Sequence, residues 1–475
     1  MAEDIMQKIV SLCKRRGFVF PGSEIYGGLA NSWDYGPLGA QLKKNIKDDW
    51  WKQVVESRDD MVGLDGAILM NPKVWEASGH VSNFNDPLVE DIVTHKRYRA
   101  DHVIEEWLEQ NGDKPFYLDG QLVVEKLSVE AMSLEQMSKF IADNGITSPD
   151  KNELSEPKQF NLMFATHIGP TSDSGNEVYM RPETAQAIFV NFKNVINTSR
   201  KRVPFGIAQI GKAFRNEITP GNFTFRTLEF EQMEIEYFIE ENGWEAEFEK
   251  WENWMQNWAQ RIGLDMEKVS KLNVPKEELA HYSKKTIDFE FDFPFGKKEL
   301  WGLAYRTNFD LTNHMNHSGE KMEFTDPMDT KRKYIPHVIE PSLGVDRTML
   351  AILASAYCEE EVPGESEGRI VMKFAPHMAP YQVAVLPLMK KDGLEEKAQE
   401  VFDLILPHYR AEFDVSGSIG KRYRRQDEIG TPLCITVDHD TLQDGSVTVR
   451  DRDTMEQKRV PIEQLLCVLA EHLST

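Results

Sequence analysis

The 475-residue sequence predicts an α+β fold. Strand patterns dominate residues 160–240, and stretches with the apolar spacing of helices flank that segment. The final segment, about 100 residues long, alternates between strand and helix patterns, which is the signature of a small α/β domain. The length corresponds to about three domains of ordinary size.

Composition indicates a soluble globular protein, with 40% hydrophobic and 28% charged residues. No apolar run approaches the roughly 18 residues that a membrane helix needs, and the N-terminus lacks a signal-peptide pattern. The four cysteines are far apart, and no two form a C-x-x-C pair. We therefore expect neither a structural zinc site nor a disulfide framework, and a cytoplasmic location. These cysteines are Cys13, Cys358, Cys434 and Cys467.

The first 165 residues predict helices, one strand and an insertion. Residues 5–13 fit an amphipathic helix, and residues 34–56 fit a helix with an apolar residue at every fourth position. "MVGLDGAILMNP" follows as a buried strand ended by Pro72, which cannot donate to a ladder. Residues 84–165 are charged and helix-prone, so we interpret them as a helical insertion. The apolar stripe of the second helix is Leu38, Leu42, Ile46, Trp50 and Val54.

The middle of the chain alternates between helices and strands. "PETAQAIFVNF" predicts a helix with Pro182 in its first turn, and residues 240–285 predict a helical insert whose tryptophans form a packing stripe. "TIDFEFDFPF" and "KELWGLAYRTNFDL" predict strands. "HVIEPSLGVDRTMLAILASAY" predicts a strand that passes through Gly344 into an apolar helix, and a linker follows near 359–368.

The stretch "AFRNEITPGNFTFRTLEFEQMEIEYF", residues 213–238, predicts a hairpin crowded with charges. Side chains two apart on a strand share a face, so Arg215 and Glu217 point the same way. In the returning strand Phe230, Gln232 and Glu234 share one face and Met233, Ile235 and Tyr237 share the other. The second face is apolar and should pack on helices.

The polar face of the hairpin fits a ligand that carries both signs of charge. Arginine suits phosphate or carboxylate, glutamate suits an ammonium or a metal ion, and phenylalanine suits stacking on a flat ring. An amino acid together with ATP offers all of these groups. The alternative is an exposed hairpin with weak cross-strand ion pairs, and the hairpin alone does not separate the two.

Several motifs in order resemble the class II aminoacyl-tRNA synthetases. "FRNE", a turn and "FRTLEF" resemble motif 2, "SLGVDRTMLAIL" resembles motif 3, and the helix and strand ending at Pro72 resemble motif 1. Among these enzymes the chain is most similar to the dimeric type of glycyl-tRNA synthetase. Further matching stretches cover nearly the whole chain: "DYGPLG", "VGLDGAILMNPKVWEASGH", "RYRADH", "MRPETAQ", "ELWGLAYRTNFDL", "EPSLGVDR" and "GKRYRRQDEIGTPLCITVD".

The resemblance implies an antiparallel catalytic sheet flanked by helices and a C-terminal α/β anticodon-binding domain. The expected division is a first catalytic part at 1–83, the insertion at 84–165, a second catalytic part at 166–365 and the anticodon-binding domain at 370–475. The second catalytic part holds motifs 2 and 3 and the helical insert. Some relatives carry a cysteine pair before "RYRADH", whereas this chain reads "VEDIVTHKRYR", so a metal site there is in doubt.

By the same resemblance, Arg215, Glu217 and Arg347 are the expected catalytic residues. Arg215 would bridge the ATP α-phosphate and the amino-acid carboxylate, and Phe230 would stack on adenine. Glu299 would bind Mg²⁺ through ATP. The expected ATP-binding set is Arg215, Asn216, Glu217, Phe225, Arg226, Phe230, Glu299, Leu300, Gly344, Asp346 and Arg347. Read alone, Arg347 is more typical of an exposed helix and Glu299 of a strand end.

The expected glycine-binding set comprises carboxylates for the α-ammonium and a few neighbours. Alternation puts Glu231 on the other face of its strand, and Arg99 lies in the insertion, where it could simply pair with acids. The complete set is Arg99, Glu183, Phe230, Glu231, Glu234, Glu340 and Ser342.

The resemblance implies a two-step reaction on glycine, ATP and tRNA(Gly). Glycine's carboxylate attacks the α-phosphate to give glycyl-adenylate and pyrophosphate, and the acyl group then passes to tRNA, releasing AMP. The chain contains neither G-x-S-x-G nor a Walker A pattern, consistent with catalysis by positioning and charge stabilisation. Nothing is smaller than glycine, so steric crowding suffices for selection and the insertion is not expected to edit. Diadenosine tetraphosphate synthesis remains open.

The chain is strongly acidic, with a net charge of −23, which argues against DNA as a partner. The cluster "GKRYRRQ" in the C-terminal segment is the exception. A charge run is usually a solvated face, but in this family it lies in the anticodon-binding domain. Lys421, Arg422, Arg424 and Arg425 are therefore expected near tRNA phosphates.

The resemblance also implies a homodimer without membrane contact, although the 38–54 stripe could equally be an intrachain contact. Two other functions stay open: a synthetase of the same subclass for another small amino acid, and a non-catalytic relative used as a binding module. The second would have lost charged site residues, whereas Arg215, Glu217, Glu299 and Arg347 are all present.

Overall fold

The computed structural model describes residues 2–112, 114–118, 120–123, 129, 132–169, 177–218, 221–362 and 368–473. Part of the predicted linker, 363–367, and residues 113, 119, 124–128 and 130–131 of the predicted insertion lie outside these ranges. None of the helices in the described ranges has the length and apolar content needed to span a bilayer.

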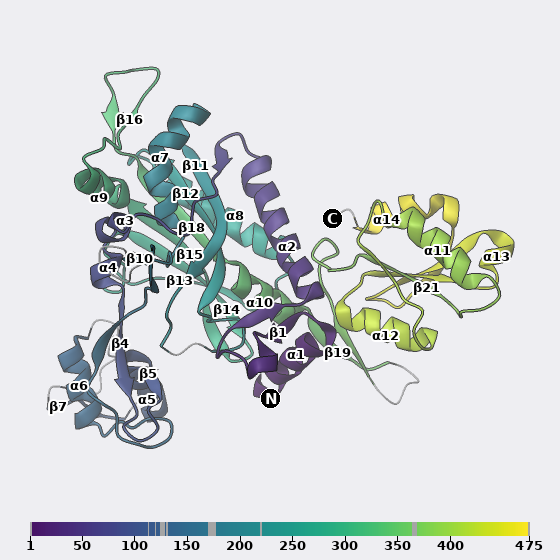
Figure 1. Ribbon diagram of the computed structural model, residues 1–475, viewed down its shortest axis with the longest axis horizontal. Coiled ribbons are helices and arrows are strands. Elements are labelled where there is room, and N and C mark those ends of the chain that lie inside the picture. Colours follow the sequence, from purple (N-terminus) through teal and green to yellow (C-terminus); the bar gives the residue numbers. More distant parts are fainter. Residues whose placement is uncertain are drawn as a thin grey trace.

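A seven-stranded sheet forms the centre of the molecule (Figure 1). Neighbouring strands are antiparallel except β11 and β3, which run parallel. The order is β13 (Val269–Asn273), β14 (Lys285–Phe293), β15 (Gly296–Thr307), β18 (His337–Gly344), β12 (Glu229–Ile239), β11 (Phe205–Phe214) and β3 (Met61–Gly63). The predicted α+β class, with an antiparallel catalytic sheet, is confirmed.

Helices cover both faces of this sheet (Figure 1). One face packs against α1 (Ala2–Arg16), α2 (Pro37–Trp51), α8 (Trp244–Arg261) and α10 (Val345–Ala356). The other face packs against α7 (Ala185–Ser199) and α9 (Phe309–Ser318). Met233, Ile235 and Tyr237 of β12 lie on the first face, as alternation predicts, and Phe238 lies on the second.

The apolar stripe of residues 38–54 packs inside this chain. All of its residues are at most 7% exposed and belong to the core on the α2 side of the sheet. The tryptophans of α8 also pack there: Trp251 and Trp258 are each 2% exposed, and Trp244 and Trp254 are partly buried. The packing interpretation of the tryptophans is confirmed, and of the two alternatives left open for the 38–54 stripe the structure shows the intrachain contact.

Three local predictions were wrong. The strand before Pro72 is only the three residues of β3, because β3 pairs only with β11, as the short last strand of the sheet. The helical insert ends at Arg261, because residues 269–273 pair with β14. The helix expected to begin at Pro182 begins at Ala185, so Pro182 and Glu183 lie in the chain that leads into α7.

The insertion is not purely helical. A three-stranded sheet of β5 (Arg97–Arg99), β4 (Asn85–Glu90) and β8 (Lys158–Asn161) packs with α5 (Ala100–Asn111) and α6 (Leu134–Asp143) around a small apolar core. A hairpin of β6 (Phe116–Leu118) and β7 (Gln121–Val123) adjoins them. Two short helices, α3 (Lys73–Ala77) and α4 (His80–Asn83), lead into this unit.

The C-terminal segment is an α/β domain at the far end of the molecule (Figure 1). Its strands are ordered β22 (Ala411–Phe413), β21 (Val383–Pro387), β23 (Leu433–Val437), β24 (Ser446–Asp451) and β25 (Gln457–Pro461). The first three are parallel and the last two antiparallel. Its helices are α11 (Leu394–Ile405), α12 (Ile419–Ile429), α13 (Thr441–Asp444) and α14 (Leu465–Leu473).

Short hairpins and turns complete the chain. The pair β19 (Tyr357–Glu360) and β20 (Arg369–Met372) connects the central unit to the C-terminal domain, and β20 packs against α12. The others are β1 (Val19–Pro21) with β2 (Trp33–Tyr35), β9 (Ala165–His167) with β10 (Glu177–Tyr179), and β16 (Phe324–Thr325) with β17 (Lys333–Tyr334). Single helical turns occupy Glu24–Tyr26, Lys52–Glu56 and Ile462–Gln464.

Candidate active site

Two adjoining cavities lie on the polar face of the β11–β12 hairpin. The first, the arginine cavity, has a volume of about 150 Å³ and is lined by Arg215, Arg226 and Arg347 together with Glu217 and Glu299. The second, the carboxylate cavity, has a volume of about 410 Å³. Both cavities are lined by Arg215, Gln232, Glu299 and Ser342, so they share a wall. The structure brings together residues as far apart in the sequence as Glu183 and Arg347.

Arg215 is held between two aromatic rings in the arginine cavity. Its guanidinium carbon lies 5.3 Å from the ring centres of both Phe84 and Phe230, and its Nε donates to the Pro182 carbonyl at 3.1 Å. The aromatic faces and the carbonyl orient the guanidinium and leave its remaining N–H groups for an anion.

Arg347 lies at the opposite end, at the start of α10. Its guanidinium stacks 4.5 Å from the Phe225 ring, and its Nη1 approaches a Glu299 carboxylate oxygen at 3.2 Å. The Glu299 side chain is 51% exposed, so this ion pair is accessible to a ligand and contributes little stability. The buried side chain of Leu300 also lines this cavity. Nε of Arg226 lies 4.0 Å from a carboxylate oxygen of Glu217. Gly344 also lines this cavity.

Two predicted nucleotide contacts are engaged with the protein. The Asp346 carboxylate accepts from Lys43 at 2.7 Å, from the backbone N–H of Glu231 at 2.7 Å and from the Tyr35 hydroxyl. Asp346 thereby anchors α10 to α2 and β12, and it also lines the arginine cavity, so its contact to ATP stays a prediction. The backbone N–H of Asn216 donates to Leu162 at 2.8 Å, and the cavity lining does not include this residue.

The carboxylate cavity contains three of the predicted acids. Glu183 lies 3.3 Å from Nε2 of His80 and accepts from Gln186 at 3.0 Å. Burial opposes its ionisation, but His80, Arg306 and Gln186 outweigh that effect and hold the pKa of Glu183 below its ordinary value. Glu234 accepts from Ser342 at 2.8 Å and from the Thr184 hydroxyl. Burial and the charge of Glu183 raise the pKa of Glu234.

Arg306 is the main residue that the sequence did not indicate. It is buried, donates to both carboxylate oxygens of Asp310 at 2.8 Å and donates to Glu340 at 2.7 Å. The ring of Tyr282 covers it at 3.8 Å. Burial raises the pKa of Glu340 to about 8 despite Arg306, and Glu234 and Glu183 add to the rise. A cationic ligand would restore the ionised form of this carboxyl.

Two members of the predicted glycine set lie elsewhere. Glu231 points to the other face of β12 and pairs with Lys43 at 3.0 Å and Lys47 at 2.7 Å, because the strand period of two separates it from Glu234. Arg99 pairs with Asp86 at 2.9 Å and Asp101 at 2.5 Å inside the insertion. Neither lines the carboxylate cavity, and Glu231 lines the adjoining arginine cavity instead.

The C-terminal domain carries a separate basic cavity of about 710 Å³. Lys421, Arg424 and Arg425 of α12 line it together with Arg16 and Arg450, and none of its described lining residues is acidic. Arg422 is different: it is 2% exposed and donates to the backbone carbonyls of Asp414 and Leu388 at 3.1 Å and of Pro387. It supports the domain internally, so its expected contact with tRNA was wrong.

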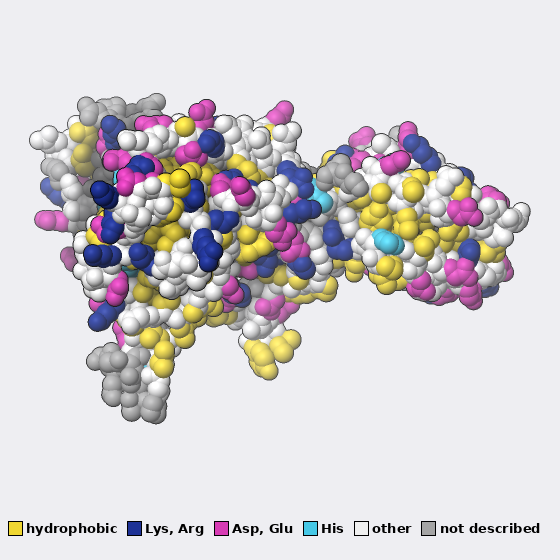
Figure 2. All heavy atoms as spheres, turned by 90° about the horizontal axis from the view of Figure 1, so that it is seen from above, with side chains coloured by type: hydrophobic (Ala, Val, Ile, Leu, Met, Phe, Trp, Pro, Cys, Tyr) yellow, Lys and Arg dark blue, Asp and Glu magenta, His cyan; other side chains and the backbone are white. Residues whose placement is uncertain are grey.

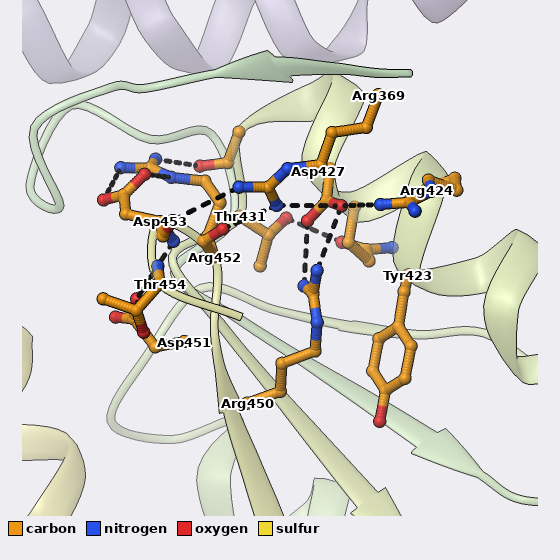
Figure 3. Close-up of polar contacts among 12 residues, drawn as sticks. Arg369, Tyr423, Arg424, Asp427, Thr431, Arg450, Asp451, Arg452, Asp453 and Thr454 are labelled. Carbon is orange, nitrogen blue, oxygen red and sulfur yellow. Dashed lines mark hydrogen bonds and ion pairs between the residues drawn. The ribbon is translucent and has the colours of Figure 1, made fainter. Parts of the chain in front are cut away.

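A single buried carboxylate organises this basic region (Figure 3). Asp427 of α12 is 0% exposed and accepts from Arg450 at 2.9 Å and from Arg369 and Arg424 at 3.3 Å. Arg369 belongs to β20 and also donates to the backbone carbonyl of Arg452 at 2.7 Å. The connecting hairpin is thereby fixed to the helix that carries the basic cavity.

Comparison with protein families defines the class. The family model "tRNA synthetase class II core domain (G, H, P, S and T)" matches residues 164–356. This range contains Arg215 and Arg347 of the arginine cavity and Glu183, Glu234 and Glu340 of the carboxylate cavity. The "Anticodon binding domain" model matches residues 382–472. The chain therefore has the two parts of a class II aminoacyl-tRNA synthetase.

Similarity to individual proteins defines the family. The chain is 53% identical to a glycine–tRNA ligase of Macrococcus caseolyticus (strain JCSC5402) over 100% of both chains. It is 52% identical to that of Alkaliphilus oremlandii (strain OhILAs) and 53% identical to that of Staphylococcus aureus (strain JH9), over 99% of each chain. The chain belongs to the glycine–tRNA ligase family.

Proposed function

We propose that this protein attaches glycine to tRNA(Gly) in two steps at the cost of one ATP. The observation that carries the proposal is the shared wall between the arginine cavity and the carboxylate cavity. ATP fits the first through its phosphates and adenine, and the glycine ammonium fits the second. Arg215 lines both cavities, at the position where the two reacting groups meet.

In the first step, a carboxylate oxygen of glycine forms a bond to the α-phosphorus and the bond to pyrophosphate breaks. Arg215 neutralises charge on the α-phosphate, and Arg347 neutralises charge on the departing pyrophosphate. The two aromatic rings beside Arg215 fix its direction, so little reorganisation is needed during the reaction. In the second step, a terminal ribose hydroxyl of tRNA attacks the acyl carbon and AMP leaves.

Selection of glycine follows from the crowded carboxylate cavity. Glu183, Glu234 and Glu340 surround the place of the ammonium, and Ser342 holds Glu234. A side chain on the substrate α-carbon would collide with these groups, so alanine is excluded by overlap and no editing site is required.

Glu299 fits a supporting role for Mg²⁺. It is a half-exposed carboxylate that lines the arginine cavity, and it forms an ion pair with Arg347 at 3.2 Å. Hard divalent cations bind such oxygen ligands together with nucleotide phosphates, and Mg²⁺ there would neutralise phosphate charge. Glu299 and Arg347 would then hold the triphosphate from two sides.

The decisive test of the activity is ATP–pyrophosphate exchange with glycine, alanine, serine, threonine and proline. We expect exchange with glycine only. Exchange that favours another amino acid would assign the chain to a different reaction of the same subclass, and the absence of exchange with all five would exclude a ligase activity.

We further propose that the basic cavity contacts tRNA phosphates. The chain as a whole is acidic, and acidic and basic side chains are interspersed over the face in Figure 2, so a cavity whose charged lining residues are all cations is a local exception. Lys421→Ala with Arg425→Ala should reduce the slope of log binding constant against log salt by about two. An unchanged slope would count against tRNA contact at this cavity.

We propose a homodimer that acts in the cytoplasm. The loop after β1 exposes Ile25 and Tyr26, at 88% and 87%, and Leu29, at 62%, a cluster typical of an interface with a second copy. Sedimentation should show a dimer, and Ile25→Asp with Tyr26→Asp should shift it to monomer. A dimer that persists in this variant would place the interface elsewhere.

We propose that the 84–165 insertion assists the transfer step through contact with the tRNA acceptor arm. Its apolar core is separate from the two cores of the catalytic sheet, so it can be removed as a unit. Deletion of residues 91–154, which retains Phe84 beside Arg215 and Leu162 beside Asn216, should lower transfer to tRNA and leave glycine-dependent exchange intact. Unaltered transfer would refute this role.

A further inference from the structure

Glu236 is a buried carboxyl that the proposed reaction does not use. It lies in β12, two residues beyond Glu234, and is 0% exposed. Neither of its carboxyl oxygens has a hydrogen-bond partner among the described residues. An ionised carboxylate in such a place would be very costly, because it would be neither hydrated nor paired.

Strand register places Glu236 directly behind the glycine-binding carboxylates. The pairing of β12 with β18 joins Glu234 to Ser342 and Tyr237 to Ile339, so the same register sets Glu236 opposite Glu340. Directly opposite residues have Cβ atoms about 4.5–5.5 Å apart and share a face of the sheet. Glu236 therefore lies on the same face of β12 as Glu234, directly behind the carboxylates that would bind glycine.

The surroundings of Glu236 are apolar on one side and charged on the other. Ile207 is its partner on β11, and Phe238 is the next residue on the same face of β12; both belong to the apolar core under α7. The groups that act electrostatically on Glu236 are Glu340 of β18, Arg306 of β15, Glu234 of β12 and Asp310 of α9. Burial and the charge of Glu340 raise the pKa of Glu236 well above its ordinary value.

These groups require that Glu236 be neutral. Arg306 is the one cation in this set, and it is already committed to Asp310 through two hydrogen bonds and to Glu340 through a third. A further negative charge at Glu236 would have no partner and would be repelled by three carboxylates, those of Glu340, Glu234 and Asp310. A neutral carboxylic acid, in contrast, carries an O–H donor, and the nearest carboxylate across the strand pair is Glu340.

We propose that Glu236 is a positioning residue for glycine recognition: as a protonated acid it donates its hydrogen to Glu340 and keeps that carboxylate ionised for the substrate ammonium. This inference rests on the proposed function. It adds a proton-bearing residue behind the recognition site that touches neither glycine nor ATP. The glycine ammonium and the Glu236 hydrogen then stabilise Glu340 from opposite sides.

The test uses two substitutions of nearly equal shape in the full-length protein. Glu236→Gln keeps a neutral donor, whereas Glu236→Met keeps the unbranched length without any donor. The measurement is kcat/KM for glycine in ATP–pyrophosphate exchange between pH 6 and 9. We expect the wild-type profile to rise with the ionisation of Glu340, whose pKa is about 8.

The Met variant should shift the midpoint of this profile upward by about one pH unit, because a hydrogen bond to the carboxylate is lost. At pH 7 that shift lowers kcat/KM for glycine about tenfold, and most of the loss should be recovered at pH 9. The Gln variant should keep the wild-type midpoint. The KM for ATP should be the same in all three proteins, which serves as the control for folding.

Three results would overturn the inference. A downward shift in both variants would mean that Glu236 is ionised, since both remove a negative charge. Midpoints that do not move in either variant would mean that Glu236 has no link to Glu340. Phe238→Leu, a change on the same strand face without a carboxyl, should leave the midpoint alone, and a shift equal to that of the Met variant would attribute the effect to packing. Failure of wild-type exchange with glycine would instead refute the proposed function.

Discussion

Asp427→Asn should selectively destabilise the C-terminal domain. The substitution keeps the shape of the side chain and removes the charge that faces three arginines (Figure 3). Arg450 is 3% exposed and donates two hydrogen bonds to Asp427, at 2.9 and 3.2 Å. Removing one partner of a buried ion pair costs about 3–5 kcal/mol. Arg369 keeps its bonds to backbone carbonyls, so we expect the lower end, about 3 kcal/mol.

Urea denaturation separates this effect from the rest of the molecule. All ten tryptophans lie at or before Trp301, so tryptophan fluorescence reports on the catalytic part and far-ultraviolet circular dichroism reports on both parts. For a slope of about 1–3 kcal/mol per molar urea, the C-terminal transition should move down by about 1–3 M. The fluorescence transition and the glycine-dependent exchange rate should not change.

Asp453→Asn is the matched control for this experiment. Asp453 accepts from Arg452 at 2.8 Å in the same region, but its side chain is 46% exposed. Exposed pairs contribute about 0–1 kcal/mol, so its transition should stay near that of the wild type. Equal midpoints for the two variants would refute the reasoning, because burial of the carboxylate would then have no consequence.

Three further predictions concern the active site. Glu183→Gln should raise the KM for glycine about 10–100-fold in pyrophosphate exchange and leave the KM for ATP unchanged, because a charged hydrogen-bonding group is lost only from the carboxylate cavity. Wild-type kcat/KM for glycine should fall about tenfold per pH unit below pH 8 in the same assay, since the Glu340 pKa of about 8 is raised and the ammonium requires the ionised form. Arg215→Ala should lower kcat of exchange about 10²–10³-fold through loss of positive charge at the α-phosphate; a fall in glycine affinity alone would contradict its bridging position.

The geometry of the hairpin could be predicted from the sequence because it depends on local backbone periodicity. Alternation assigned Glu234 to the ligand face and Glu231 to the opposite face, where Lys43 and Lys47 pair with it. The same rule placed Met233 and Ile235 against helices. A strand imposes this period whatever its tertiary partners are.

Residues whose role depends on distant pairing were not predictable in this way. Arg306 was part of a quoted strand, but its importance arises from the register of β15 with β18, which sets it beside Glu340. A signal was present, since Asp310 follows four residues later, a spacing that brings side chains together at the start of a helix. Arg422 was misassigned because a run of basic residues does not reveal which helix face is buried.

Short strands and helix starts were the other weak points. Residues 64–72 looked apolar enough for a strand, yet β3 ends at Gly63, because only three of its residues pair with β11. The start of α7 was placed early because Pro182 is favourable in a first helical turn. The extended chain there serves the site instead, since the Pro182 carbonyl accepts from Arg215.

The hydrogen bonds of Asp346 connect α2 to the arginine cavity, which is proposed to bind ATP. Asp346 adjoins Arg347 in the chain, and Lys43 of α2 bonds to its carboxylate together with Tyr35 and the backbone of β12. Movement of Arg347 along the sheet would therefore strain the hydrogen bonds of Asp346 to Lys43 and Tyr35. Displacement of α2 is accordingly expected to weaken ATP binding, because both helices share this one carboxylate.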